Sequence, residues 1–185
     1  WVLGNRTLTN FLPGAGVLGV LWGVVAAKIG RGRLLAHVGG AVVATTYLTL
    51  VVGTQLAPGE SVGGLFQATS DSVVEAYFDL VVGSRATTTE IGHFLLVLGI
   101  ICWGAGQFAG YTAFAHRRPV ATVLLPGSIL LANVVLTIRD QYPLLVVFSL
   151  AALLFLVRFH VADEQRAWVR HRIGDVGDAV GLSLR

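Results

Sequence analysis

The chain has 185 residues, of which 55% are hydrophobic and 12% charged, and its mean hydropathy is +0.75. Soluble globular domains carry roughly 25% charged residues, so this composition excludes an ordinary soluble domain. The formal net charge is +3, but the basic residues stand in short clusters at the ends of apolar runs. That arrangement is typical of orientation signals in membrane proteins and not of a nucleic-acid surface. The single cysteine excludes an intramolecular disulfide framework.

The apolar runs predict an all-α polytopic membrane protein with about five transmembrane helices. Each run approaches the ~20 residues that cross a bilayer as a helix. The runs are continuously apolar, without the alternation of a membrane β-barrel, so helices are the expected form. The chain would form one bundle over residues 1–162, followed by a basic cytoplasmic juxtamembrane tail, residues 163–185, that begins as a helix on the membrane surface. The predicted spans are residues 11–27, 34–56, 91–115, 119–138 and 143–160.

An acidic outer loop, residues 57–90, separates the second span from the third. Ser72 and Glu75 have the spacing of a capping box, which predicts a helix that begins there. This short amphipathic extracytoplasmic helix, residues 73–82, would lie on the membrane or across the end of the bundle. Thr87 and Glu90 repeat the capping-box spacing directly before the third span. The predicted apolar face of the short helix consists of Val73, Tyr77, Leu80 and Val81.

The basic residues predict the orientation of the chain in a bacterial cytoplasmic membrane. If five spans alternate, only Arg6, Arg85 and Arg139 lie on the outer side, together with most of the acidic residues. By the positive-inside rule, residues 28–33, 116–118 and 158–185 are cytoplasmic. This orientation places Trp1 outside, so we expect a further span upstream of it. The cytoplasmic basic residues, several of which could also bind anionic headgroups, are Lys28, Arg31, Arg33, Arg117, Arg118, Arg158, Arg166, Arg170, Arg172 and Arg185.

Small and polar residues within the spans predict how the helices pack. Gly19 and Gly23 in the first span, and Gly106 and Gly110 in the third, have the small-xxx-small spacing of close helix contacts. Asn133, which we assign to helix packing, is polar at membrane depth, and so is Gln107. Polar residues at this depth can mark function, but an interhelical hydrogen bond is the more frequent role. Pro126 predicts a kink in the fourth span.

Histidines near the ends of spans are the candidate ligands of a cofactor. His37, His93 and His160 could each bind haem or a chlorophyll-type pigment if a second ligand faced them at the same depth. Interfacial, solvated histidines are the ordinary alternative. Cys102 lies deep in an apolar run without a base nearby in the sequence, and no metal-binding or phosphate-binding motif is present. We therefore expect no catalytic centre, metal site or resident cofactor in this chain.

The order of features from the third span onward resembles a known family. The resemblance is to the N-terminal membrane region of bacterial transglutaminase-like membrane proteins of the TgpA type, and it covers about the last 80 residues. It implies a further span and an extracytoplasmic domain with a Cys-His-Asp triad, to which Cys102 does not correspond. The elements that carry it are Trp103 and Gly106 to Arg118-Pro119, residues 123–127 through Asn133, Arg158-Phe159-His160, residues 164–168 and residues 172–175.

Three functions remain open from the sequence. The first is a membrane anchor or scaffold bundle of a larger transglutaminase-like protein. The second is an accessory structural subunit of a multi-chain respiratory or photosynthetic complex, which packs against partner helices or pigments. The third is a transporter, which requires a polar cavity near Asn133, Gln107 and Pro126. The expected partners are the lipid bilayer and further segments of the same polypeptide or other membrane subunits, and no nucleic acid.

Overall fold

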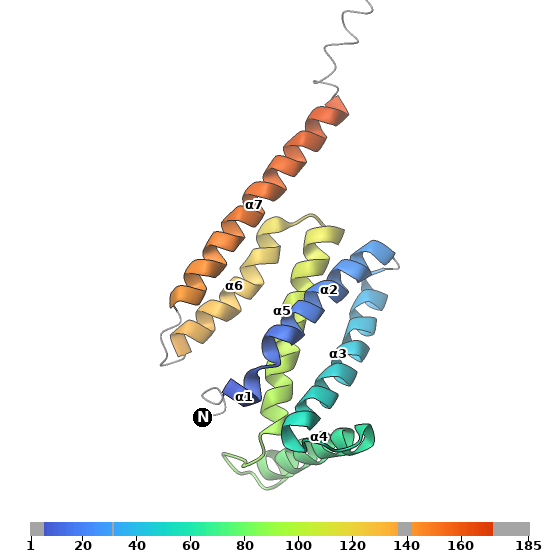
Figure 1. Cartoon of the computed structure of the whole chain (residues 1–185), viewed down its shortest axis with the longest axis vertical. Helices are drawn as coiled ribbons and strands as arrows, with labels where there is room; N and C mark the ends of the chain where they lie inside the picture. Colours follow the sequence, from blue (N-terminus) through green and yellow to red (C-terminus); the bar gives the residue numbers. More distant parts are fainter. Residues whose placement is uncertain (1–5, 31, 137–141, 172–185) are drawn as a thin grey trace, which may run out of the picture. The chain divides into compact units, whose positions relative to one another are not determined.

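The computed structural model describes residues 6–30, 32–136 and 142–171, and every regular element among them is helical (Figure 1). Four helices are long and apolar enough to cross a membrane, so the prediction of an all-α multi-pass membrane protein is confirmed at that level. Their limits are Leu12–Ile29, Arg33–Leu56, Gly92–Ala115 and Tyr142–Trp168. The chain divides into two compact units, Trp1–Pro126 and Gly127–Arg185, which are described separately below.

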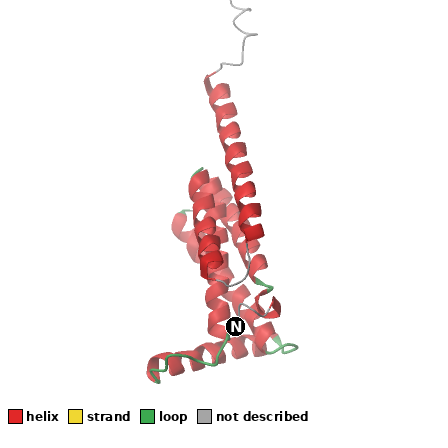
Figure 2. Ribbon diagram, turned by 90° about the vertical axis from the view of Figure 1, so that its left-hand side faces the viewer, coloured by secondary structure: helices red, strands yellow, loops and turns green. Residues whose placement is uncertain are grey.

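The first unit is a bundle of three long helices closed at one end by a fourth. In it α2 and α5 run parallel, α3 runs antiparallel to both, and α4 crosses the end where α3 stops and α5 begins (Figures 1 and 2). A π-helical segment, η2, continues α4. The elements are α1 (Arg6–Thr9), α2 (Leu12–Ile29), α3 (Arg33–Leu56), α4 (Val62–Tyr77), η2 (Phe78–Val82), α5 (Gly92–Ala115) and the first turns of α6 (Pro119–Leu136).

Glycines bring the backbones of α2 and α5 into direct contact. The glycines predicted to pack helices all lie at this interface, two on each helix. Direct backbone contact between helices is favourable in lipid, because helix association there depends on van der Waals packing and not on the hydrophobic effect. In each case a Cβ on the glycine would collide with a backbone carbonyl oxygen of the other helix: Gly19 with Trp103, Gly23 with Gln107, Gly106 with Gly16, and Gly110 with Val20.

Large apolar side chains fill the bundle at the end nearer to α4. Leu48 and Val52 of α3 and Leu95 of α5 are fully buried there. Gly99 of α5 lies against Leu48, where an added Cβ would come within 2.7 Å of a Leu48 methyl group. The bundle therefore has a close-packed apolar end beside α4.

The helix within residues 57–90 begins earlier than the sequence predicts. Its N-cap is Ser61, whose Oγ accepts from the Gly64 amide at 3.3 Å. Ser72 lies inside α4, and its Oγ accepts from the amide of Gly92, the first residue of α5, at 3.2 Å. The capping box predicted at Ser72 is therefore wrong, because this serine caps a different helix across a tertiary contact.

The packed face of α4 also differs from the predicted apolar face. Thr69, Ser72 and Ala76 are buried against the bundle, whereas Tyr77 is 55% and Val81 58% exposed. Small residues face the protein because α4 approaches α3 closely, and the large apolar side chains remain on the outside. A helix does occupy this position, and the face that it packs against the bundle is not the predicted apolar face.

The residues before α5 form a loop and do not cap that helix. Asp79 accepts from Arg85 at 2.7 Å and from the Thr88 hydroxyl at 2.9 Å. Thr88 Oγ1 in turn accepts from the amide of Glu90 at 3.2 Å. The N-cap position of α5 makes no side-chain hydrogen bond. The second predicted capping box, Thr87 with Glu90, is therefore also wrong, because α5 begins after Ile91 and the neighbouring Thr88 hydroxyl binds Asp79.

The second unit contains the rest of α6 and the long helix α7 (Tyr142–His171). α6 starts at Pro119 as predicted and contains Pro126, but the apolar helix described there, Pro119–Val135, is shorter than the four long ones. The predicted end of this span, residue 138, lies outside the described residues.

α7 continues without a break past the predicted end of the fifth span. Its 30 residues correspond to about 45 Å at 1.5 Å per residue, which exceeds the ~30 Å of hydrocarbon in a bilayer. No glycine or proline follows Pro143 within the helix, so nothing in the local sequence ends it near Arg158. The apolar span and the first part of the charged tail therefore form one helix, and residues 172–185 of that tail lie outside the described residues.

Candidate functional site

A buried glutamine joins the three long helices of the first unit. The Trp103 indole N–H donates to Gln107 Oε1 at 3.0 Å, one turn away on α5. Gln107 Nε2 donates to the Ala36 carbonyl oxygen of α3 at 3.3 Å, and the Trp22 indole of α2 donates to the same oxygen at 3.1 Å. Gln107 thus makes the interhelical hydrogen bond that the sequence predicts. Gly40 of α3 leaves the space for its amide, since a Cβ there would collide with it.

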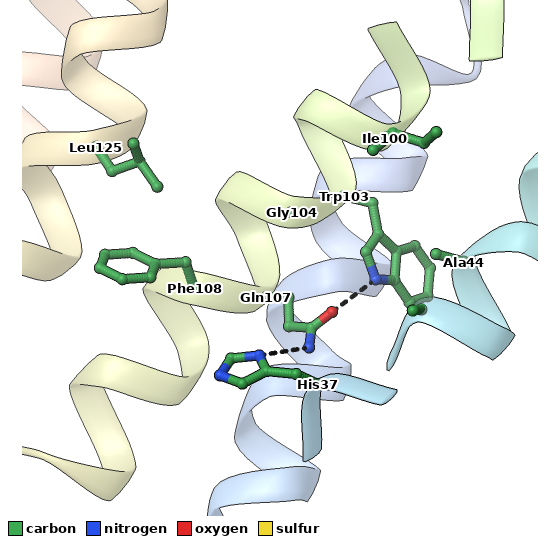
Figure 3. Close-up of a pocket in the computed structure, with 9 residues that line it drawn as sticks. His37, Ala44, Ile100, Trp103, Gly104, Gln107, Phe108 and Leu125 are labelled. Carbon is green, nitrogen blue, oxygen red and sulfur yellow. Dashed lines mark hydrogen bonds between the residues drawn. The ribbon is translucent and has the colours of Figure 1, made fainter. Parts of the chain in front are cut away.

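The partners of Gln107 determine the orientation of its amide and the tautomer of His37. An indole N–H can only donate and a carbonyl can only accept, so Oε1 faces Trp103 and Nε2 faces Ala36. Nε2 also lies 3.4 Å from His37 Nδ1 (Figure 3). Because an amide nitrogen only donates, Nδ1 must be the acceptor, and a neutral His37 carries its proton on Nε2.

Aromatic rings extend this cluster toward the end of the bundle that carries Lys28 and Arg33. The His37 ring lies 5.5 Å from the Tyr111 ring, and Tyr111 meets the His116 ring edge to face at 5.4 Å. Both separations fall within the range of favourable aromatic pairs. Two histidines that are distant in the sequence therefore lie on either side of one tyrosine.

The roles of Trp103 and Tyr111 were not predicted from the sequence. Together with Gln107 they recur at intervals of four residues, a spacing that places side chains on one helical face. This face is buried: Trp103 is 4%, Gln107 8% and Tyr111 9% exposed. The spacing was the available signal, but hydropathy alone does not distinguish such a face from ordinary core.

A cavity of about 410 Å³ lies beside this cluster, between α3, α5 and the first turns of α6 (Figure 3). Its polar edge is formed by His37, Gln107 and Trp103, and the remaining lining side chains are apolar or glycine. Ligand sites typically measure ~300–1,000 Å³ and combine mainly apolar walls with a few placed polar groups. The arrangement can hold a small apolar molecule and contact it at one polar point.

The other candidate ligand residues are not gathered into one centre. His93 lies at the opposite end of the first unit from His37, and its buried Nδ1 has no hydrogen-bond partner among the described residues. His160 is exposed on α7 in the second unit, and Cys102 is half-buried on α5. Within the described part of the chain, no three His, Cys, Asp or Glu side chains could hold a metal ion.

Charge is segregated between the two ends of the first unit. Lys28 lies in the last turn of α2, Arg33 begins α3, and Arg117 and Arg118 lie in the turn after α5, all at the end away from α4. Arg117 adopts a φ of 50°, and the Arg118 amide donates to the Thr112 carbonyl at 3.2 Å.

The remaining predicted packing and topology residues belong to the second unit or to segments that are not described. Asn133 lies on α6 with an exposed side chain. On α7, Arg166 lies 3.6 Å from Asp163, and Arg170 belongs to the last turns of the helix. Arg31 and Arg172 lie outside the described residues.

Comparison of the chain with protein-family models, with curated proteins and with solved structures finds no match.

Proposed function

We propose that this chain is a membrane scaffold, a helical bundle that anchors and positions other protein segments at the bilayer. The observation that supports it best is the direct backbone contact of α2 with α5 through Gly19, Gly23, Gly106 and Gly110. Close contact at small residues, with Gln107 bonded to the α3 backbone, is typical of tightly associated membrane helices. A tightly packed helical bundle keeps the segments at its two ends at a constant separation, as a membrane anchor requires.

α4 is attached to one end of the bundle by contacts with α3 and α5. The Thr69 hydroxyl donates to the Thr49 carbonyl of α3 at 2.8 Å, in a buried position. The Leu65 backbone lies so close to Gly53 that a Cβ there would collide with it, and Ser72 binds the first amide of α5. α4 is thus held by α3 and α5 together, and it presents a fixed surface at the acidic end of the first unit.

We further propose five spans, with α6 as the fourth of them, and a cytoplasmic location for the basic end. The segregation of Lys28, Arg33, Arg117 and Arg118 from the acidic end supports this orientation. Cysteine labelling in intact cells tests it, after replacement of the natural cysteine by Cys102→Ser. A membrane-impermeant maleimide should label Ser84→Cys and Tyr142→Cys in intact cells, but Lys28→Cys only after permeabilisation.

Each departure from this labelling pattern contradicts a defined part of the proposal. Labelling of Lys28→Cys alone in intact cells would reverse the orientation. Labelling of Ser84→Cys without Tyr142→Cys would place both ends of α6 on the cytoplasmic side, so α6 would not cross the membrane.

The identity of the anchored segment is tested on the natural polypeptide extracted from its own membrane. A mass several-fold above the 19.6 kDa of this chain, without visible absorbance, favours the anchor of a larger protein. The transglutaminase-like form of this proposal rests on the sequence resemblance, and it requires that the additional part react with a thiol-directed probe at an active-site cysteine. Co-purification of a 19.6 kDa chain with other subunits or a chromophore would instead support the accessory subunit. A chain that purifies alone at this mass would overturn both.

A further inference from the structure

We propose that the cavity beside His37 binds a small, mainly apolar molecule of the bilayer through a neutral carbonyl oxygen. This inference does not depend on the scaffold role, because it rests on the cavity and on the hydrogen bonds that surround it.

A hydrogen-bond donor lies at the polar edge of the cavity. The bonds from Trp103 through Gln107 to His37 Nδ1 place the imidazole proton on Nε2, the ring nitrogen that points away from Gln107 (Figure 3). No described residue accepts a hydrogen bond from this nitrogen. His37 is exposed, so this N–H is accessible to a molecule that enters the cavity and supplies an oxygen atom as the acceptor.

The walls of the cavity select a neutral molecule. His37 is the only titratable side chain among the lining residues. A carboxylate or phosphate would lose its hydration without gaining a counter-charge from the walls, and the free-energy cost of burying an unpaired charge is high. A carbonyl oxygen accepts the same hydrogen bond and carries no such cost.

The length of the cavity indicates an amphiphile that lies along the helices. His37 and Ala44 are seven residues apart on α3, so the lining extends over about 10 Å at 1.5 Å per residue. The polar contact lies at the end nearer to Arg33, and Ala44 and Ile100 line the deeper, apolar part. Two bilayer components have the required chemistry: the ring carbonyl of a quinone and the ester carbonyl of an acyl lipid. Trp103 and Phe108 also suit a flat ring.

The test uses the whole chain in lipid nanodiscs and a short-chain benzoquinone as the probe. Quinone binding is followed by quenching of tryptophan fluorescence, in discs of ester-linked phosphatidylcholine and in discs of ether-linked phosphatidylcholine, which has no acyl ester carbonyls. His37→Phe removes the N–H and keeps a ring beside Tyr111. Gly104→Leu fills the cavity from a position where an added Cβ meets nothing within 4 Å. His116→Phe is the matched control, because His116 contacts the same tyrosine and does not line the cavity.

We expect saturable quenching in ether-lipid discs, with a Kd raised about tenfold by His37→Phe, the effect of losing roughly one hydrogen bond. Gly104→Leu should abolish binding, and His116→Phe should leave the Kd unchanged. Equal affinities in the two lipids would indicate a quinone-like ligand. Binding at least tenfold weaker in ester-linked discs would identify the acyl ester as the competing occupant.

Two results would overturn the proposal. One is the absence of saturable quenching in ether-lipid discs. The other is an unchanged Kd in His37→Phe, which would show that the His37 donor makes no contact with the ligand. If Gly104→Leu fails to fold, the Kd values of His37→Phe and His116→Phe still test whether the His37 donor contacts the ligand.

Discussion

α5 and α7 are both long enough to cross a membrane, but they differ in composition and in how far their side chains are buried. The most apolar window of α7 has a mean hydropathy of 2.4, against 1.6 for α5. α5 contains five glycines, four of which touch other helices closely, whereas α7 contains none. The large side chains of α7 remain on its surface, as at Leu154, which is 67% exposed. The more hydrophobic helix is therefore not the more buried one.

The physical reason is the solvent. In a bilayer the lipid tails are as apolar as leucine, so a leucine gains little from moving out of lipid into a helix interface. Glycine gains more, because its missing side chain allows backbone contact along a whole helix. Hydropathy therefore shows which segments enter the membrane, and small residues show which faces associate.

Leu48→Ala should lower the free energy of unfolding by about 3 kcal/mol, since it leaves a cavity in the bundle core. Leu48 is fully buried between α3 and α5. The same substitution at Leu154 on α7 should change it by about 0.5 kcal/mol or less, as for exposed positions generally. Unfolding is measured by titration of the detergent-solubilised chain with a denaturing detergent, followed by circular dichroism. Equal losses for the two variants would contradict the proposed contrast between these helices.

Gly106→Ala and Gly104→Ala should have effects of opposite sign, although they make the same change two residues apart. A Cβ at Gly106 collides with the Gly16 carbonyl, so its strain should cost about 2 kcal/mol. A Cβ at Gly104 meets nothing, and the higher helix propensity of alanine should stabilise the chain by up to ~1 kcal/mol. The same titration measures both. A stabilising Gly106→Ala would show that α2 and α5 are not in backbone contact.

Gln107→Leu should cost about 1–2 kcal/mol, because the Trp103 indole loses its acceptor and the α5–α3 hydrogen bond is removed. The control is Ser149→Ala on α7, whose hydroxyl bonds only to the Leu145 carbonyl of its own helix. It should change stability by less than about 0.5 kcal/mol. If Gln107→Leu proved neutral or stabilising, the polar contact would contribute nothing to helix association.

Ser72→Ala should cost about 1 kcal/mol, the usual loss for a missing helix cap, although Ser72 does not belong to the helix that it caps. Hydrogen exchange of the Gly92 amide should become faster in this variant, because that amide donates to Ser72. Ser70→Ala is the control, since the Ser70 hydroxyl bonds within α4 to the Phe66 carbonyl. An unchanged hydrogen-exchange rate of the Gly92 amide would show that Ser72 does not cap α5.

The errors in the sequence analysis have a common origin. The capping-box patterns at Ser72 and Thr87 fit a helix start locally, but in the structure the Ser72 hydroxyl bonds to α5 and the hydroxyl of the neighbouring Thr88 bonds to Asp79. The face of α4 that packs against the bundle was not predicted for a related reason. Its partner helices require small residues at the contact, and a hydrophobic pattern cannot show how closely a partner approaches.

Local sequence patterns are enough to predict the helical membrane character of this protein, the limits of α3 and α5 to within one residue, and the clustering of basic residues at helix ends. These properties follow from local hydropathy and charge, which act on each segment independently. Only the tertiary structure decided which glycines meet, and which residues join Gln107. His37 and Gln107 are 70 residues apart, and their contact depends on the parallel pairing of α2 with α5 and on the antiparallel path of α3 beside this pair. Each helix is apolar enough to be stable in the membrane by itself, so hydropathy allows several packing arrangements. The observed arrangement is selected by close backbone contacts at particular small residues.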